Sequence, residues 1–368
     1  MAKRQYGKED QERGSRIAAP ELPYLPQDPK RYHPKIGLIG CGGISEYHLR
    51  AYKKVGYDVA ALCDRHLDRA DARRREFFPK ATIYNDYRDL LRREEIEVVD
   101  ITTHPPDRVG QIEQALRAGK HVLSQKPFVL DLSQGERVAD LADHKGLKLA
   151  VNQNGRWAPH FSYIRQAIDK KLIGDVLSVH LAVHWNHDWV AGTKFDAIKH
   201  LVLYDFGIHW FDIVTAFMGG RRAKRVYASV SRAKGQKAQP PLLAQAMIEY
   251  DGAQASIVFD GFAQFGPRDD THVMGSTGSI TSTGPDLARQ RVTLYTKRGH
   301  GSPRLRGTWF PGGFHGAMGE LLCAIEEDRE PSNGARANLE SLALCFAAAR
   351  AADTGRAQKP GNIRTLIE

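Results

Sequence analysis

The sequence predicts an α/β fold in two parts: an N-terminal domain with a parallel sheet, then a C-terminal α+β domain with a mostly antiparallel sheet. The chain has 368 residues, which is room for about two domains of ordinary size. From Lys35 to Asn152, short β-branched runs alternate with amphipathic helical stretches, as in repeated βαβ units. After Asn152, strand-like runs with hairpin turns predominate, which favours antiparallel pairing. We therefore expect an extended arm over residues 1–34, a first domain over 35–152 and a second over 153–368, with its final helices packed back toward the first.

The first domain is expected to begin with a strand and to alternate strands with helices. The runs that predict strands are Ile36–Ile39, Val59–Leu62, Val98–Thr102, His121–Leu123 and Leu147–Val151. Apolar residues at helical spacing predict helices over Tyr47–Val55, Leu67–Phe77, Arg108–Ala118 and Leu132–His144. This alternation predicts a parallel sheet covered by helices.

The second domain is expected to begin with a helix around Phe161–Lys171. Alternating runs then predict strands at Val176–Trp185, Val226–Val230, Gln245–Tyr250, Ala255–Phe259 and Val292–Tyr295. The pairs Asp251-Gly252 and Thr277-Gly278 are typical of hairpin turns. The last predicted elements are helices over Ala317–Glu326 and Leu339–Ala352.

The first 34 residues are polar, basic and interrupted by prolines, without a helical or strand period. Their prolines are Pro20, Pro23, Pro26, Pro29 and Pro34. Two interpretations are equally open: a frayed tail, or an arm that lies over a neighbouring subunit and buries Tyr24, Leu25 and Tyr32.

Composition narrows the class of protein. Hydrophobic residues make up 42% and charged residues 26%, close to the globular average. The charged N-terminus and the absence of a long apolar run predict a cytoplasmic protein without a leader and without a membrane partner. Four scattered cysteines fit a reducing compartment better than a zinc site or a disulfide framework. The net charge of +10 favours anionic small molecules or solubility, and we expect no nucleic-acid partner.

A glycine-rich turn follows the first predicted strand and precedes a helix. It comprises Gly40, Cys41, Gly42, Gly43, Ile44 and Ser45. Glycines in this context let a pyrophosphate approach the backbone at a helix N-terminus. Asp64 ends the second strand 24 residues after Gly40, where a carboxylate suits the ribose diol of NAD. Arg65 suits a 2′-phosphate, so NADP stays open.

Lys126 stands at the carboxyl end of a predicted strand, where open α/β sheets bind ligands. The alternative is an ordinary surface lysine, because most lysines lie exposed on the protein surface. The following Pro127 fixes the turn, and the strand-end location favours a functional role. An ammonium group there would hydrogen-bond a substrate hydroxyl and stabilise an alkoxide as a hydride leaves.

Asp205, His209 and Asp212 share one face if the segment is helical. An imidazole flanked by carboxylates can take a proton near neutral pH. The alternative is a core histidine whose hydrogen bonds are made by its neighbours. Two acidic residues on the same face weaken this alternative.

A group of polar and indole side chains ends a strand of the second domain, from His184 to Trp189. Such side chains suit sugar recognition through hydrogen bonds and stacking. A metal site is the alternative, but His184 and His187 cannot face the same way along a strand, so we expect no metal. Further hydroxyl-recognising groups at the domain junction are Asn154, Arg156 and Trp157.

Several stretches together resemble the glucose-fructose oxidoreductase / inositol dehydrogenase (Gfo/Idh/MocA) family. They are Gly40–Ser45, Ala118–Pro127, Arg156–Pro159, Gly174–Val176, Asp205–His209, Phe314–Glu320 and Glu330–Ser332. The resemblance implies an N-terminal Rossmann domain, a C-terminal domain with a large open sheet, and homodimers or homotetramers built through that sheet, with arm exchange in some members. It also implies reversible hydride transfer between nicotinamide and a carbinol carbon of a sugar, cyclitol or glycoside. Lys126 matches the lysine of the family's Glu-Lys-Pro motif, His209 its catalytic histidine, and Asp205 the aspartate that orients the substrate.

The sequence departs from the family pattern in three places. Gln125 replaces the glutamate before the lysine, which keeps a hydrogen-bonding group but removes a charge. The glycine-rich stretch before the family's Asp-x-Gly-x-His is here Lys199–Tyr204, and His104 and Arg108 stand where the family commonly has a proline and a histidine.

The prediction is therefore an NAD(P)-dependent dehydrogenase of a sugar-like substrate. Besides the glycine turn, the expected cofactor-binding residues are Asp64, Arg65, Thr103, His104, Gln125, Lys126 and Asn154. The expected substrate-binding residues are Lys126, Arg156, Trp157, His184, His187, Asp205, His209 and His315. The alternative within enzymology is a redox-neutral enzyme that keeps NAD bound and oxidises its substrate only transiently. A nucleotide-sensing scaffold is the alternative outside it.

Overall fold

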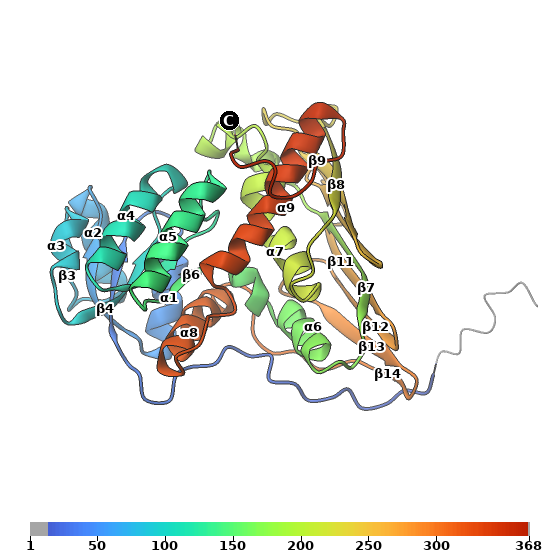
Figure 1. Cartoon of the computed structure of the whole chain (residues 1–368), viewed down its shortest axis with the longest axis horizontal. Coiled ribbons are helices and arrows are strands. Elements are labelled where there is room, and N and C mark those ends of the chain that lie inside the picture. The colour runs from blue at the N-terminus through green and yellow to red at the C-terminus, as the bar shows by residue number, and fades with distance from the viewer. Residues whose placement is uncertain (1–13, 367–368) are drawn as a thin grey trace, which may run out of the picture.

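The computed structural model describes residues 14–366 and places them in two sheets (Figure 1). The first sheet has the order β3-β2-β1-β4-β5-β6, and all its pairings are parallel. Its strands are β1 (Lys35–Ile39), β2 (Asp58–Cys63), β3 (Thr82–Tyr84), β4 (Ile96–Ile101), β5 (His121–Ser124) and β6 (Leu149–Val151). The helices between them are α1 (Ser45–Val55), α2 (Leu67–Phe77), α3 (Tyr87–Leu91), α4 (Pro105–Arg117) and α5 (Leu132–His144). The predicted parallel sheet is confirmed, and its strand order reverses between β1 and β4, where such folds bind ligands beyond the carboxyl ends of the strands.

The central strands are apolar on both faces because helices cover both faces. Ile36 and Leu38 of β1 belong to one buried cluster, and Ile39 belongs to another, together with Val99 of β4. Burial of each such side chain contributes about 1.5–3 kcal/mol. This packing fixes the end of β1 and therefore the turn that follows it.

The sequence does not predict β3 and α3, because segments of three and five residues are too short to show a period. Elsewhere in the first sheet the predicted elements form with small shifts at their ends. The helices over Leu67–Phe77 and Leu132–His144 begin and end at the predicted residues.

The second sheet has the order β14-β13-β12-β11-β7-β10-β9-β8. Its strands are β7 (Val176–His184), β8 (Arg225–Ser231), β9 (Leu243–Tyr250), β10 (Ala253–Asp260), β11 (Arg268–Gly275), β12 (Gly278–Gly284), β13 (Arg291–Thr296) and β14 (Gly299–Gly301). Its β7–β10 pairing is parallel, and the remaining pairings are antiparallel, as predicted. Hairpin turns form at Asp251-Gly252, as predicted, and at Ser276-Thr277, one residue before the predicted pair, because Gly278 already begins β12.

Strands β11, β12 and β14 are absent from the prediction because their pattern is weakly apolar. In β11 and β12 the buried positions include Asp269, Thr271 and Ser282, so the usual alternation of apolar and polar residues is lost. Strand β14 has three residues, two of them glycine.

Helices lie on one face of the second sheet (Figure 1). They are α6 (Pro159–Asp169), α7 (Ile208–Phe217) and α9 (Ala335–Thr354). Trp210 of α7 packs against Phe259 of β10 with ring centroids 5.1 Å apart. The other face carries exposed apolar side chains on four strands: Tyr227, Met247, Met274 and Tyr295.

The last two helices join the two parts of the molecule. Helix α8 (Gly312–Glu326) packs against α1 and against the short turn Asn154–Trp157. Helix α9 contacts α5 beside the first sheet and α7 and β8 in the second. Within residues 14–366, no helix combines the length and the apolar character needed to cross a bilayer. The four cysteines are buried and unbridged.

The described part of the N-terminal segment lies along its own chain, at the bottom of Figure 1. It pairs with β14 through Ile17 N–H, which donates to His300 O at 2.9 Å. Further along, Ser162 Oγ donates to Tyr24 O at 2.6 Å, and a carboxylate oxygen of Glu326 accepts the backbone N–H of Tyr32 at 3.0 Å. These contacts are not those of a frayed tail. Residues 1–13 of the predicted arm lie outside the described residues.

Candidate active site

The glycine-rich turn joins β1 to the N-terminus of α1 and leaves open space above its backbone. Gly40 has φ 97°, and a Cβ atom there would lie 2.9 Å from Thr103 Cγ2, so this position requires glycine. A Cβ atom at Gly42 or Gly43 would meet nothing within 4 Å. Ser45 Oγ donates to Gly42 O at 2.6 Å and closes the turn. The turn therefore offers an open backbone surface at a helix N-terminus, which fits a pyrophosphate.

Asp64 lies beside this turn. Its Oδ2 accepts the backbone N–H of Cys41 at 2.8 Å, and its Oδ1 accepts that of His66 at 2.9 Å. These bonds hold the carboxylate at the end of β2, where it fits a ribose diol. Arg65 is exposed next to it, and Ile44 lies at the start of α1. Burial, and then the charge of Asp64, raises the pKa of Cys41 to about 12, so this thiol is unreactive.

The loop after β4 faces the glycine turn. Thr103 Oγ1 donates to Gln111 Oε1 at 2.6 Å, which orients its methyl group toward Gly40. His104 is exposed and precedes the first turn of α4. Both residues lie at the carboxyl edge of the sheet, on the side of the glycine turn.

Lys126 and Asp205 meet across the two parts of the molecule. Lys126 follows β5, and its Nζ donates to Asp205 O at 2.8 Å and to Asp205 Oδ2 at 3.3 Å. Asp205 belongs to a π-helical turn over Val202–Phe206. Both side chains are partly accessible, 17% and 13% exposed. The sequence motifs at positions 126 and 205 thus form one charged pair that a ligand can reach.

His209 stands in the first turn of α7, close to this pair. Its Nδ1 is buried and has no hydrogen-bond partner among the described residues, whereas Nε2 stays accessible. Its ring meets the indole of Trp309 edge to face at 5.3 Å, and a Cβ atom at Gly155 would lie 3.7 Å from Nδ1. Burial, and then the charge of Lys126, lowers the pKa of His209 well below its usual range. The imidazole is therefore neutral at neutral pH and able to accept a proton.

The predicted common helical face of Asp205, His209 and Asp212 does not form. Helix α7 begins at Ile208, so Asp205 lies in the turn before it. The carboxylate of Asp212 is bound by Arg156, with Nε to Oδ2 at 2.6 Å and Nη2 to Oδ1 at 2.7 Å. This ion pair is buried, and Arg156 Nη1 also donates to Ser332 O, so protein groups engage both side chains.

Asn154 joins the group around His209, and Trp157 does not. Asn154 Oδ1 accepts from Trp309 Nε1 at 3.1 Å. The amide therefore lies beside the indole that contacts the His209 ring. The Trp157 ring is buried under α8, where a Cβ atom at Gly316 would lie 2.1 Å from it.

The predicted sugar-recognition stretch forms an aromatic surface beside Asp205. His187 stacks on Trp185 at 5.6 Å and meets Phe206, the neighbour of Asp205, at 4.8 Å. Burial lowers the pKa of His187 to about 4. His184 is held by Asp260 at 2.7 Å. Trp189 is 58% exposed at the edge of this surface. No group of three or more metal-ligating side chains occurs between residues 14 and 366.

His315 contacts the N-terminal segment. Its Nε2 lies 2.8 Å from Asp28 Oδ1, and its ring centroid lies 6.0 Å from that of Tyr57. The structure thus places His315 in the contact between α8 and the arm, and its contacts include none of Lys126, Asp205 or His209.

Sequence reasoning assigned no role in the site to two residues, one of which, Arg108, it noted only as a departure from the family pattern. Trp309 comes from the loop before α8, and no motif marks it. Arg108 is fully buried in α4, and its guanidinium donates to the carbonyl oxygens of Thr103 and Gln125, at 3.1 and 2.5 Å, and of Pro127. Arg108 therefore braces the turn that presents Lys126.

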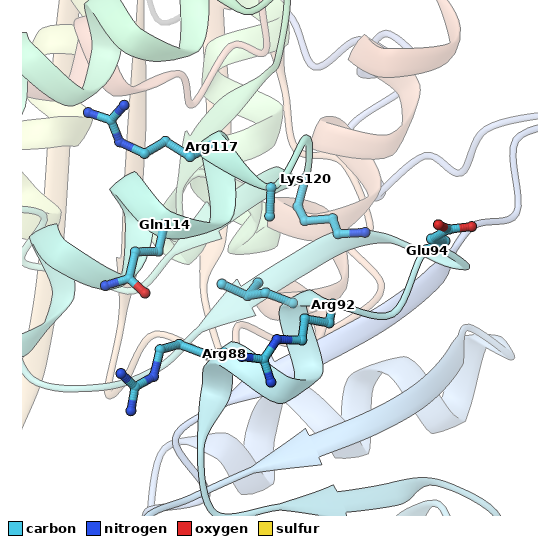
Figure 2. Close-up of a pocket in the computed structure, with 8 residues that line it drawn as sticks. Arg88, Arg92, Glu94, Gln114, Arg117 and Lys120 are labelled. Carbon is cyan, nitrogen blue, oxygen red and sulfur yellow. The ribbon is translucent and has the colours of Figure 1, made fainter.

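A hollow of about 460 Å³ lies between α3 and α4 (Figure 2). It is lined by Arg88, Leu91, Arg92, Glu94, Gln114, Arg117, Ala118 and Lys120. These residues precede β4 or β5, so the hollow lies at the amino ends of the strands, and Lys126 follows the carboxyl end of β5.

Comparison with known proteins supports the fold and the cofactor. Residues 34–153 match the model of an oxidoreductase family with an NAD-binding Rossmann fold, and residues 161–281 match the Gfo/Idh/MocA C-terminal domain. The chain belongs to the Gfo/Idh/MocA oxidoreductase family. It is therefore an enzyme that binds NAD through its Rossmann domain, as the sequence predicts.

Proteins with related sequences or structures include named dehydrogenases. A D-apiose dehydrogenase of Paraburkholderia graminis is 26% identical over 88% of each chain. An inositol 2-dehydrogenase of Salmonella typhimurium is 30% identical over 48% of this chain and about half, 54%, of its own length. A levoglucosan dehydrogenase solved with NADH and levoglucosan is 18% identical and has a TM-score of 0.75 over 89% of this chain and 100% of its own, which shows a shared fold.

Proposed function

We propose that this enzyme transfers a hydride between NAD and the carbon of a secondary hydroxyl on a sugar, cyclitol or glycoside. The observation that carries the proposal is the meeting of Lys126, Asp205 and a neutral, unpartnered His209 at the carboxyl edge of the Rossmann sheet. The names of the relatives, which act on D-apiose and inositol, support a polyhydroxylated substrate.

In the oxidation direction, the substrate hydroxyl would lie between the Lys126 ammonium and Nε2 of His209. Lys126 would donate a hydrogen bond to the hydroxyl oxygen and stabilise its negative charge as the proton leaves. His209 would accept that proton on Nε2, and the electron pair of the C–H bond would leave the carbon as hydride. Asp205 would keep the ammonium in place. When bound, NAD supplies the hydride-accepting carbon.

Residues around the site would bind the rest of the substrate. Asn154 would offer its amide to hydroxyls, and the Trp309 indole would pack on C–H faces of a ring. His187 and Trp185 extend this aromatic surface away from Asp205.

The experiment is absorbance at the reduced-nicotinamide band with NAD and a panel of D-apiose, inositols, levoglucosan and glycosides. A steady rise with one substrate is expected. His209→Ala should lower turnover by about 10²–10⁴ while NAD still binds, as for a lost acid–base group. The matched control is His144→Ala, an exposed histidine at the end of α5, which should not change the rate. Unchanged turnover in H209A would refute the proton-transfer role, and substrate loss without accumulated NADH would refute net oxidation.

We propose in addition that two copies associate through the outer face of the second sheet. The exposed side chains of Tyr227, Met247, Met274 and Tyr295 support this, because such apolar surface on one face is typical of an interface. Sedimentation of the wild type and of Met247→Lys tests it: a dimer or tetramer that dissociates in M247K is expected, and a monomeric wild type would refute it.

The buried, unbridged cysteines support a cytoplasmic location.

A further inference from the structure

A chain of buried polar side chains lies beneath Lys126 and ends at its backbone. Asp100 of β4 is fully buried, and its Oδ2 accepts from Tyr52 OH at 2.6 Å and from His48 Nδ1 at 2.7 Å. His48 Nε2 lies 3.0 Å from Gln125 Nε2. Gln125 Oε1 in turn accepts the backbone N–H of Lys126 at 2.6 Å. The chain thus connects a buried carboxylate with the lysine of the proposed site.

The donor and the acceptor of each hydrogen bond in this chain can be assigned. Gln125 Oε1 accepts the Lys126 N–H, so the amide nitrogen of Gln125 faces His48. Asn152 Nδ2 also faces His48 Nε2, at 3.2 Å. An amide nitrogen only donates, so Nε2 of His48 must accept. The ring proton is therefore on Nδ1 and points at Asp100.

The surroundings of His48 leave it no other charged partner among the described residues. The Phe314 ring of α8 covers it at 4.8 Å, and the Tyr52 ring lies at 6.1 Å. Asp100 is the charged group that contacts it, and Gln125 and Asn152 are neutral. Because His48 and Asp100 are both fully buried, their hydrogen bond is strong, and water does not compete for either group.

We propose that His48 and Gln125 form a positioning relay that holds Lys126, and that the amide at position 125 keeps the proton of His48 on Nδ1. The proposal rests on the role of Lys126 in the function proposed above. Lys126 is held at two points, its backbone by Gln125 and its ammonium by Asp205, and the relay fixes the first of them.

A carboxylate at position 125 would change the proton count of this relay. Its oxygens only accept, so His48 would need a second proton on Nε2 to bond to it. The ring would then be an imidazolium between two carboxylates and would lose that proton as the pH rises. Gln125 therefore removes one negative charge and one proton from the buried chain that ends at Lys126.

The first test is the nitrogen spectrum of histidine-labelled protein, which needs no activity. In the wild type, the His48 signals, assigned from their loss in His48→Phe, should show a protonated Nδ1 and an unprotonated Nε2. Gln125→Glu should protonate both nitrogens at neutral pH. A protonated Nε2 in the wild type, or an unchanged spectrum in Q125E, would overturn the relay. If H48F does not fold, the histidine whose Nε2 gains a proton in Q125E identifies His48, and its absence would overturn the relay.

The second test is kinetic and separates positioning from core packing. H48F should lower kcat about tenfold, because a small displacement of a reacting group is costly. The matched control is His160→Phe, which removes another buried imidazole, one whose nitrogens have no partner among residues 14–366. H160F should keep the wild-type kcat, and equal losses in the two variants would overturn the positioning role.

The pH profile completes the kinetic test. Q125E should gain an ionisation in kcat that the wild type lacks and that the double variant H48F/Q125E loses. Persistence of that ionisation in the double variant would overturn the assignment to His48. If wild-type protein oxidises nothing in the substrate panel, the proposed function fails, and the nitrogen spectrum alone decides on the relay.

Discussion

Replacement of Arg108 by methionine should destabilise the protein, because the guanidinium holds the turn that carries Lys126. Arg108 is fully buried in α4. Its Nε donates to Thr103 O at 3.1 Å, and its Nη1 donates to Gln125 O at 2.5 Å and to Pro127 O. Nη1 also lies 3.4 Å from Phe128 O. Met keeps the apolar stem but leaves the carbonyl groups of Thr103, Pro127 and Phe128 without this donor. The carbonyl of Gln125 keeps a second donor, Ser124 Oγ at 3.2 Å.

The magnitude follows from two opposed effects. Each stranded buried carbonyl costs about 1–3 kcal/mol, so the three cost roughly 3–9 kcal/mol. The variant also relieves the burial of a cation. That burial lowers the pKa of Arg108 from 12.5 to about 10, and at about 1.4 kcal/mol per unit the relief is roughly 3 kcal/mol. We expect a net loss of about 3 kcal/mol from the free energy of unfolding.

Urea unfolding of the wild type, Arg108→Met and Arg117→Met measures this effect. Arg117 lies at the end of the same helix and is exposed; Figure 2 shows its side chain. R117M should change the free energy of unfolding by less than about 0.5 kcal/mol. An R108M variant as stable as R117M would refute the bracing role. Turnover should fall in R108M under conditions where it is folded, because the turn at Lys126 loses its support.

Three further predictions concern charge and protonation. Lys126→Met should raise the pKa of His209, because a nearby positive charge now lowers it, and an NMR titration that matches the wild type would contradict this. His160→Phe should lessen acid destabilisation: burial lowers the pKa of His160 to about 3, so stability falls below pH ~6.5 by up to about 1.4 kcal/mol per unit, and urea unfolding at several pH values measures the difference. Asp64→Ala should weaken NAD binding about tenfold by calorimetry, since charge-assisted bonds contribute roughly 1.5–3 kcal/mol, and equal affinity would exclude Asp64 from the ribose site.

The parts of the site that the sequence predicts are those that local chemistry determines. The turn at Gly40 needs a positive φ, and Asp64 follows the adjacent strand. The spacing of these two residues in the sequence therefore reveals both. Lys126 is marked by the end of a buried strand. Trp309 and Arg108 are not visible in this way, because no spacing marks their contacts. Trp309 bonds to Asn154, 155 residues away, and Arg108 bonds to the carbonyl of Gln125 in the turn after the next strand.

The interpretation of Asp212 shows why spacing alone fails. Residues three apart on a helix do share a face, but the spacing does not say which neighbour binds the carboxylate. Arg156 belongs to the turn after β6 and binds both oxygens of Asp212. The one carboxylate of α7 that could flank His209 is therefore bound to Arg156 instead. The nearby charge that acts on the imidazole is instead the cation of Lys126. Burial, and then that charge, lowers the pKa of His209, which favours a base over a resident imidazolium.

This arrangement makes the chemistry depend on both parts of the molecule at once. Lys126 belongs to the Rossmann sheet, whereas Asp205 and His209 belong to the segment that leads into α7. The Lys126 ammonium is held by Asp205 across the junction, and the same ammonium lowers the pKa of His209. If the two parts separated, the lysine would lose its partner and the imidazole would lose the charge that helps to keep it neutral. The contact between the two parts therefore holds the cation and lowers the pKa of the imidazole at the same time.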